Sequence, residues 1–414
     1  MMDSPALRVL DRSLGKGVCF GLSLVLAPLK WIPRRARRPQ RILLVELFEM
    51  GASVMLQPSL RVLREKLPQA EIWILTTELT EESWKVFPDV DPNRIYVIRG
   101  KGVIPFLWGC LCAVFSLSRV GFDLIIDYVL FFRISAVLVA LIWSRQKAGF
   151  FRYHVDGVYR GNFLTFPCSY NQNLHIAKNF LALTQTALET ASDYPNYKGA
   201  IRSDQLSLPR IALKPEWVES VSKKLDPFRK ADTQIIGISP DVGKNLSQRN
   251  YPLASWAAVL KSLEAYPRLL PVLIGTMPNR WVEEELRKLG STRWVSLIGQ
   301  TTFPELLAFL AQSTLVVAND NGIAHFCGLT ETPSVALFST DSPFVYGPLG
   351  PCTVLYSFFQ CSPCISAWNH KQSTCADNRC LQVISPQMVL DFIHLGLKGK
   401  LRPQTIQNGM SYLL

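Results

Sequence analysis

The chain has 414 residues, of which 48% are hydrophobic and 18% are charged, and its formal net charge is +12. This composition excludes an intrinsically disordered chain and leaves room for two or three domains. Between Arg12 and Val45 there are eight basic residues and no acid. Without these eight residues, the positive and negative charges of the chain are nearly equal in number. This argues against a basic nucleic-acid-binding surface and predicts no nucleic-acid partner.

Residues 14–33 are apolar and run directly into an arginine-rich stretch, the reverse of a secretory signal, in which positive charges come first. The apolar core between Lys16 and Lys30 has 13 residues, fewer than the roughly 20 that span a bilayer. We therefore expect residues 1–40 to lie on an anionic membrane surface, with Trp31 at the headgroup level. The alternative is a helix packed on the body of the protein, followed by an exposed basic linker.

From Arg41 onwards, apolar strand patterns alternate with helical patterns, which indicates a parallel sheet with helices on both faces. The expected strands are 41–47, 70–77, 95–100 and 122–128, and the expected helices are 54–68, 103–118 and 130–143. The last two helices are strongly apolar. Burial inside the protein is enough to account for their apolar composition, because the first is too short to span a bilayer and Arg133 interrupts the second. The alternative is that either helix packs against a membrane.

A polar stretch at 191–210 contains proline and glycine and is typical of a linker, and the alternation restarts after it. The expected strands are then 233–240, 269–276, 294–300, 315–318 and 335–338, and the expected helices are 253–266, 280–290 and 301–313. This α/β pattern predicts two Rossmann-like halves. We assign residues 41–200 to an N-terminal domain, 201–395 to a C-terminal domain and 396–414 to a C-terminal tail.

A polar turn, Asn319–Gly322, interrupts the apolar pattern of the second half. Its carboxylate, amides and flexible glycine follow a strand and precede a short helical pattern, where free N–H groups suit phosphate. Asn319 and Asp320 could equally act as helix caps. His325 lies three residues into the helix, and its place beside this turn favours ligand contact over a purely structural role.

The loop 239–252 follows the first strand of the second half. Gly243, Lys244 and Arg249 offer flexible backbone donors and cations, which a diphosphate needs. The loop is no Walker A motif, because GxxxxGK[ST] is absent, and it could also be a solvated loop with incidental charge. In a doubly wound half, however, it projects from the same sheet edge as the turn at 319–325, which strengthens both assignments.

The corresponding first turn of the N-terminal half holds Glu46, Glu49 and Gly51. A carboxylate at this position can serve as a general base, and Glu49 is our candidate. It could equally be a solvent-facing loop residue.

Four cysteines follow in the segment 361–380, which also contains His370. Cys361 and Cys364 form a CxxC pair, and Cys375 and Cys380 lie further on, a pattern compatible with a structural zinc or iron–sulfur site. The second pair is not CxxC, so reduced thiols or disulfides remain the alternative. The other six cysteines are typical of small apolar side chains in a cytosolic protein.

Several segments carry a resemblance to a known family. The family's opening strand, glycine turn and helix are similar to RILLVELFEMGASVMLQPSLRVLREKLPQAEIWILT. Its next two blocks have the pattern of FDLIIDY and QKAGF. Its most characteristic motif, an Asn-Asp-Thr-Gly turn followed by a histidine, is similar to NDNGIAHFCGLTETPSVALFSTDSPFVYGPLGP. Together they resemble glycosyltransferase family 9, the ADP-heptose:lipopolysaccharide heptosyltransferase-like proteins, from about Arg41 to Ile393. A cysteine-rich segment also occurs in members of this group.

The resemblance implies a GT-B fold, with two Rossmann-like, doubly wound domains facing a cleft. It also implies a nucleotide-sugar donor on the C-terminal half, a lipid-linked or oligosaccharide acceptor on the N-terminal half, and inverting transfer that needs no cofactor or metal. Asp320, Asn321, Gly322 and His325 match the donor motif, with Asn321 where the family usually has threonine. Arg249 falls where the family carries a phosphate-binding lysine.

The resemblance fails at one position. The family normally has an aspartate, taken as the catalytic base, directly after the glycine of the first turn, whereas here Gly51 is followed by Ala52. Either Glu49 substitutes, or the acceptor is activated differently, or the protein is catalytically weak. We expect a glycosyltransferase at the cytoplasmic face of a bacterial membrane, building a cell-envelope glycan. The alternatives are a catalytically degenerate nucleotide-sugar-binding or envelope-assembly partner, and a membrane-surface scaffold.

Overall fold

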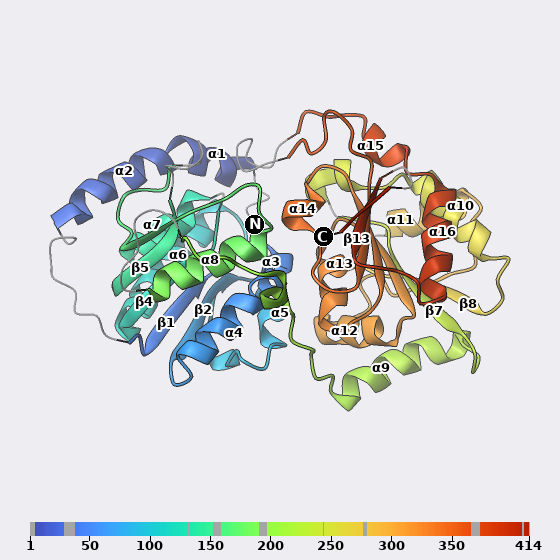
Figure 1. Ribbon diagram of the computed structural model, residues 1–414, viewed down its shortest axis with the longest axis horizontal. Helices are drawn as coiled ribbons and strands as arrows, with labels where there is room; N and C mark the ends of the chain where they lie inside the picture. Colours follow the sequence, from blue (N-terminus) through green and yellow to red (C-terminus); the bar gives the residue numbers. More distant parts are fainter. Residues whose placement is uncertain are drawn as a thin grey trace. The chain divides into compact units, whose positions relative to one another are not determined.

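A computed structural model describes residues 5–28, 38–130, 132–151, 159–189, 197–242, 244–275, 280–365, 373–407 and 410–413. The chain divides between Leu206 and Ser207 into two compact units, here called unit 1 and unit 2. Each is a sheet covered by helices (Figure 1).

Unit 1 is built on a six-stranded parallel sheet in the order β3-β2-β1-β4-β5-β6. Its strands are β1 (Arg41–Val45), β2 (Glu71–Thr77), β3 (Ile95–Ile98), β4 (Phe122–Asp127), β5 (Ser144–Phe151) and β6 (Phe166–Ser169). The central strands β1 and β4 are almost continuously apolar, because helices cover both of their faces. Their register places Val45 opposite Asp127, so the carboxyl ends of these two strands meet at one edge of the sheet.

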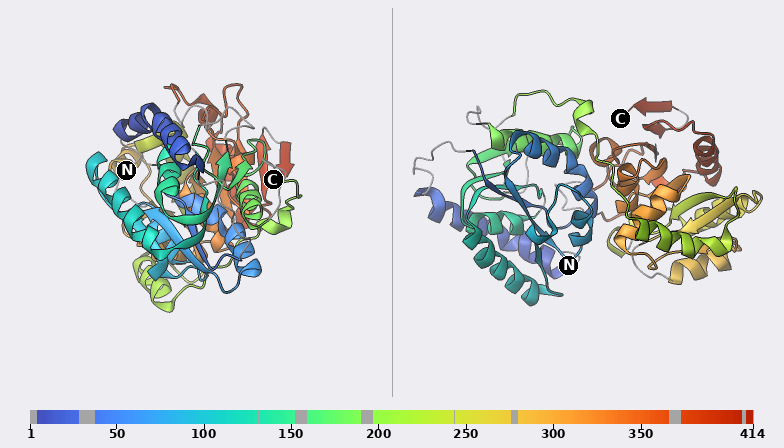
Figure 2. Two further views of the ribbon diagram at one scale, coloured as in Figure 1. Left: turned by 90° about the vertical axis from the view of Figure 1, so that its left-hand side faces the viewer. Right: turned by 90° about the horizontal axis from the view of Figure 1, so that it is seen from below.

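Two groups of helices cover this sheet. On one side lie α1 (Pro5–Ser13), α2 (Gly15–Leu26), α6 (Val103–Val120) and α7 (Arg133–Leu141), and on the other lie α4 (Gln57–Lys66) and α8 (Ile176–Leu188), as Figure 2 shows. The shorter elements are α3 (Met50–Met55), α5 (Glu81–Lys85), η2 (Pro92–Arg94) and η4 (Ser203–Leu206). Side chains of α1, α6 and α7 share one core with Leu43 and Val45 of β1 and with Phe122 and Ile125 of β4.

The N-terminal helices pack on the body of unit 1. Cys19 of α2 is buried against α7. Asp11 of α1 accepts hydrogen bonds from the backbone N–H groups of Arg133 (2.8 Å) and Ile134 (2.9 Å) at the start of α7. For these helices the structure therefore matches the second interpretation of the sequence, a helix held by the protein itself. Trp31 and three residues of the arginine-rich stretch, Arg34, Arg35 and Arg37, fall within residues 29–37, which lie outside the described residues.

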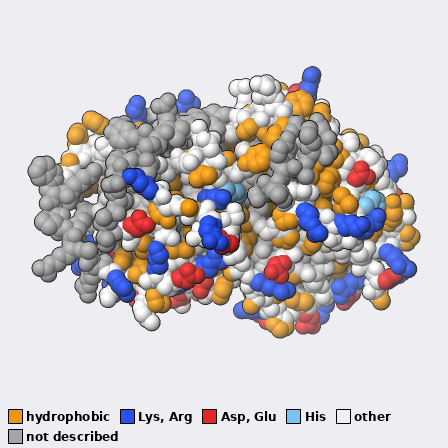
Figure 3. Space-filling model, viewed as in Figure 1, with side chains coloured by type: hydrophobic (Ala, Val, Ile, Leu, Met, Phe, Trp, Pro, Cys, Tyr) orange, Lys and Arg blue, Asp and Glu red, His pale blue; other side chains and the backbone are white. Residues whose placement is uncertain are grey.

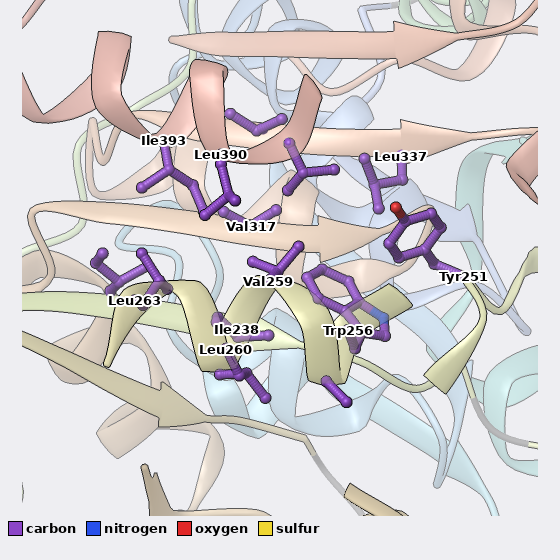
Figure 4. Packing of buried hydrophobic residues seen from close by; sticks show 14 of the residues in the cluster. Ile238, Tyr251, Trp256, Val259, Leu260, Leu263, Val317, Leu337, Leu390 and Ile393 are labelled. Atoms are coloured by element: carbon purple, nitrogen blue, oxygen red, sulfur yellow. The ribbon is translucent and has the colours of Figure 1, made fainter. Parts of the chain in front are cut away.

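Unit 2 contains an eight-stranded sheet in the order β14-β13-β12-β11-β10-β7-β8-β9, parallel except for the pair β13–β14. Its strands are β7 (Gln234–Ser239), β8 (Leu269–Leu273), β9 (Val295–Ser296), β10 (Leu315–Asn319), β11 (Ser334–Phe338), β12 (Cys352–Tyr356), β13 (Gln404–Gln407) and β14 (Met410–Leu413). The helices are α9 (Pro215–Leu225), α10 (Leu253–Leu263), α11 (Arg280–Lys288), α12 (Phe303–Gln312), α13 (Gly322–Phe326), α14 (Pro343–Tyr346), α15 (Arg379–Gln382) and α16 (Pro386–Leu397), with η5 (Asp226–Phe228), η6 (Lys244–Arg249) and η7 (Cys327–Leu329). Figure 4 shows Trp256 of α10 and Ile393 of α16 in the apolar core around Val317 of β10.

The prediction of a C-terminal tail at 396–414 is wrong for part of that segment. β13 pairs with β12, and β14 pairs with β13, so the chain end extends the sheet of unit 2. β13 shows no strand pattern in the sequence, because QTIQ holds a single apolar residue, and such a strand is recognisable only through its backbone pairing.

Candidate functional site

The predicted turn of unit 2 follows β10, a strand whose residues are all buried. Asn321 is the N-cap of α13, and its side-chain oxygen accepts a hydrogen bond from the N–H of Ile323 at 3.0 Å. The capping role that the sequence offered to Asn319 or Asp320 therefore belongs to Asn321. This leaves the other two polar side chains for different contacts.

Two asparagines fasten this turn to the loop that follows β7. The side-chain nitrogen of Asn319 donates to the carbonyl of Pro240 at 2.9 Å. That of Asn321 donates to the Ser239 hydroxyl at 2.9 Å and to the carbonyl of Asp241 at 3.2 Å. Parallel pairing of β7 with β10 brings the two segments to one edge of the sheet, as expected for a doubly wound half.

Arg249 lies at the centre of this edge, at the end of η6. Its Nε is 3.4 Å from an Asp320 carboxylate oxygen and donates to the Thr340 hydroxyl at 3.2 Å, and its Nη2 contacts the carboxylate of Asp341. Asp320 is 5% exposed and Asp341 is 2% exposed. One guanidinium thus lies between two buried carboxylates, and these contacts hold it in a fixed position. We call Arg249, Asp320 and Asp341 the arginine–carboxylate cluster.

Asp341 is the member of the cluster that the sequence analysis missed. It follows the buried strand β11 after two polar residues, just as Asp320 follows β10. The same rule that singled out Asp320, a carboxylate at the carboxyl end of a buried parallel strand, would have found it.

His325 and the glycine-containing loop complete the predicted donor residues. Ile323, Ala324 and Phe326 of α13 are buried, whereas His325 is partly exposed on the outer side of the helix, beside Gly322 at its start. The structure places Lys244 at the start of η6, but Gly243 and the Lys244 side chain lie outside the described residues.

The first turn of unit 1 has two carboxylates with different environments. Glu46 is buried at the end of β1, and its carboxylate accepts hydrogen bonds from the N–H groups of Phe48 and Glu49, both at 3.1 Å. Glu49 is the N-cap residue of α3, and its side chain is partly exposed. Gly51 and Ala52 follow in the first turn of that helix. Glu46 therefore shapes the turn, and Glu49 is the acid of this turn that solvent reaches.

A second buried acid, also missed from the sequence, lies beside this turn at the end of β4. Asp127 pairs with the Arg160 guanidinium and accepts hydrogen bonds from the Ser135 hydroxyl (3.2 Å) and the N–H of Val129 (3.1 Å). Burial raises the pKa of its carboxyl, although the charge of Arg160 opposes this. Enclosed by these partners, Asp127 stabilises the end of the strand and is poorly placed to take a proton from a substrate.

The four cysteines of 361–380 are free thiols. Burial raises the pKa of the Cys380 thiol to about 11. Within the described residues, however, no group of three or more His, Cys, Asp or Glu side chains is arranged to hold a metal ion, and His370 falls outside them. A structural metal at this segment stays a prediction.

Comparison with known proteins identifies the family. The profile of glycosyltransferase family 9 (heptosyltransferase) matches residues 114–374. The chain belongs to this family. Over 177 residues it is 26% identical to lipooligosaccharide heptosyltransferase 2 of Haemophilus influenzae, which covers 41% of this chain and 47% of that protein. The match thus spans about half the length of this curated relative.

Solved structures of family members share the fold. A family 9 glycosyltransferase of Veillonella parvula superimposes with a TM-score of 0.67 at 20% identity, covering 87% of this chain and 97% of that one. ADP-heptose lps heptosyltransferase II of E. coli gives 0.66 at 18% identity, covering 87% and 99%. The GT-B fold expected from the sequence, with two Rossmann-like domains, is confirmed, and so is the family.

Proposed function

We propose that this family 9 protein transfers a heptose or related sugar from a nucleotide-sugar donor to a cell-envelope glycan or lipid-linked acceptor, with inversion at the anomeric carbon. The arginine–carboxylate cluster carries the proposal. It sets a positioned cation at the carboxyl ends of β7, β10 and β11, where ligands bind in open α/β sheets. The names of two relatives, an ADP-heptose and a lipooligosaccharide heptosyltransferase, support the choice of sugar and acceptor.

In this proposal unit 2 holds the donor. The planar guanidinium of Arg249 presents paired N–H groups that suit phosphate oxygens, and its ion pairs with Asp320 and Asp341 hold it ready for them. His325 projects from the outer side of α13, and the loop at 239–252, which includes Gly243 and Lys244, supplies further donors. Arg249, Lys244 and the N–H groups of the loop are the donors that stabilise the leaving diphosphate in this proposal, which requires no cofactor.

The chemical step then needs a base for the acceptor hydroxyl. The hydroxyl oxygen attacks the anomeric carbon from the side opposite the diphosphate, the bond from that carbon to the diphosphate oxygen breaks, and a nucleoside diphosphate leaves. The hydroxyl proton passes to Glu49, which is the solvent-accessible acid of the first turn in unit 1. Ala52 offers only a methyl group where the family resemblance leads one to expect the base.

The replacement of that acid favours one competing proposal, a catalytically degenerate protein that binds a nucleotide sugar within an envelope-assembly complex. The two differ in turnover. Release of nucleoside diphosphate from ADP-, UDP-, GDP- and CDP-sugars, measured with and without a lipid extract of bacterial envelopes, separates them. Transfer predicts lipid-dependent release that Glu49→Gln lowers by at least ~100-fold, within the range of general-base removal. Lipid-dependent release that Glu49→Gln leaves unchanged would exclude Glu49 as the base, and no release with any donor would favour the degenerate protein.

We place the protein in the cytoplasm, attached to the inner face of the cytoplasmic membrane, where nucleotide sugars and lipid-linked acceptors meet. The eight basic residues between Arg12 and Val45 support attachment to an anionic surface.

A further inference from the structure

Helix α6 has two apolar sides, of which unit 1 covers only one. Its inner stripe, Phe106, Cys110, Ala113 and Leu117, recurs at helical spacing and is buried in the core. Its outer side is also apolar: Ile104 is 80% exposed, Trp108 67% and Phe115 65%. A surface helix of a water-soluble domain normally turns charged and polar residues outward. The outer side of α6 therefore lacks the composition expected of a surface in contact with water.

The exposed apolar surface continues onto neighbouring helices. α7 contacts both α6 and α2, and α2 and α6 run along the same side of unit 1 (Figure 2). Further large apolar side chains are exposed here: Val18, Phe20, Leu24 and Val25 on α2, Leu107 and Leu111 on α6, and Leu141 and Trp143 at the end of α7. We call the outer side of α2 and α6, with Leu141 and Trp143, the apolar face.

The helices on the opposite side of the sheet have a different surface. Over α4, Figure 3 shows acidic and basic side chains interspersed, and an ion pair links Arg61 to Glu65. The apolar face is thus a property of one side of unit 1. Contiguous apolar surfaces of this kind mark interaction sites in folded proteins.

The exposed charges on the helices that border and form the apolar face have one sign. The four helices α1, α2, α6 and α7 contain a single acidic residue, Asp11, whose side chain is nearly buried and pairs with Arg133 (3.8 Å). The exposed charged side chains on these helices are basic: Arg12, Lys16 and Arg119. An apolar surface bordered by cations complements the headgroup region of an anionic bilayer. A two-fold related second copy would instead bring these same cations toward one another.

We propose that the apolar face rests in an anionic phospholipid bilayer, with Trp108 and Trp143 at the level of the headgroups, where tryptophan is enriched. α6 has 18 residues and is apolar enough to cross a membrane, but it connects β3 to β4 of one sheet and buries its inner stripe against that sheet. It lies along the membrane plane and inserts only its outer side. This attachment involves unit 1 alone and does not depend on the proposed transfer reaction.

The test is flotation of the full chain with vesicles. Trp108→Glu/Phe115→Glu replaces two exposed side chains and leaves the buried stripe intact. The matched control is Trp281→Glu on α11 of unit 2, a tryptophan that is 61% exposed. With vesicles of phosphatidylglycerol and phosphatidylcholine, the double variant should bind at least ~10-fold more weakly than the wild type, since two apolar contacts are replaced by anions. The control should bind as the wild type does.

Two further measurements separate this proposal from its rivals. Wild-type binding should persist in part at 1 M NaCl, because insertion is apolar, whereas attachment through arginines alone would be lost. Brominated lipid should quench the protein's fluorescence less in Trp108→Phe than in the wild type. Unchanged flotation of the double variant, complete loss of wild-type binding in high salt, or a wild-type dimer that this variant dissociates would each overturn the proposal. All of these variants should bind the nucleotide sugar as the wild type does, because none of them changes the cluster in unit 2. Loss of nucleotide-sugar binding would therefore count against the proposed function and not against membrane attachment.

Discussion

The arginine–carboxylate cluster makes a sharp prediction for Arg249→Met, which keeps the length of the side chain and removes its charge. Two carboxylates, 5% and 2% exposed, then lose the cation between them. Breaking a buried ion pair from one side costs ~3–5 kcal/mol. Because the Arg249 side chain is 18% exposed, we expect a somewhat smaller loss of stability, ~2–4 kcal/mol at pH 8. Protonation neutralises a stranded carboxylate, so the loss of stability should shrink as the pH falls from 8 to 5.

Urea unfolding at pH 5, 6, 7 and 8 measures this effect. The matched control is Arg268→Met, which breaks the ion pair of Arg268 with Asp232 (2.9 Å) on the surface of the same unit. Exposed pairs contribute ~0–1 kcal/mol, so the control should show a small, pH-independent change. If Arg249→Met behaved like the control at every pH, the carboxylates would not depend on Arg249 for their charge balance, and our account of the cluster would be refuted.

Three further predictions concern other parts of the chain. Glu49→Gln should leave donor affinity within about twofold of the wild type, measured by calorimetry, because removing a general base affects the chemical step and not binding; a large loss of affinity would place Glu49 in the donor site instead. Burial alone would raise the pKa of Glu305, but hydrogen bonds from Lys224, Ser220 and Thr302 outweigh it and lower the pKa to about 2. This stabilising contribution is present above the unfolded pKa of about 4.5 and is lost as the pH falls toward 2, so Glu305→Gln should destabilise the protein by ~1–3 kcal/mol at pH 7 and by progressively less in acid; a constant difference would contradict the assignment. Finally, all ten cysteines are free, so the denatured, unreduced protein should titrate as ten thiols, and fewer thiols that a chelator restores to ten would instead reveal a metal held by the segment 361–380.

The hydrophobic pattern alone was enough to predict two α/β halves, because central parallel strands such as β1 and β10 are covered on both faces and are therefore apolar along almost their whole length. The polar strand β13 could not be predicted from the sequence, because only its backbone pairing with β12 identifies it as a strand. The packing of α2 on α7 could not be foreseen either. Protein interior and lipid are both apolar, so the same glycine-, cysteine- and leucine-containing stretch suits either environment.

The candidate site was predictable in outline, since Asp320 and His325 belong to a turn whose position follows from the strand pattern. Its internal geometry was not. Arg249 and Asp341 are 92 residues apart, and only the folded sheet edge brings the guanidinium to that carboxylate. Likewise, Asp127 and Glu46 look like ordinary acids at strand ends until the register of β1 and β4 places them beside one first turn.

Binding of a nucleotide sugar to the purified chain tests the central claim most directly. Unfolding is followed by differential scanning fluorimetry and by urea titration with ADP-, UDP-, GDP- and CDP-sugars. At 100 times its Kd, the correct donor should stabilise the protein by ~2.7 kcal/mol. His325→Ala and Arg249→Lys should abolish or strongly reduce this gain. If no nucleotide sugar stabilises the chain, or if both variants respond as the wild type does, the cluster at the edge of unit 2 is not a donor site.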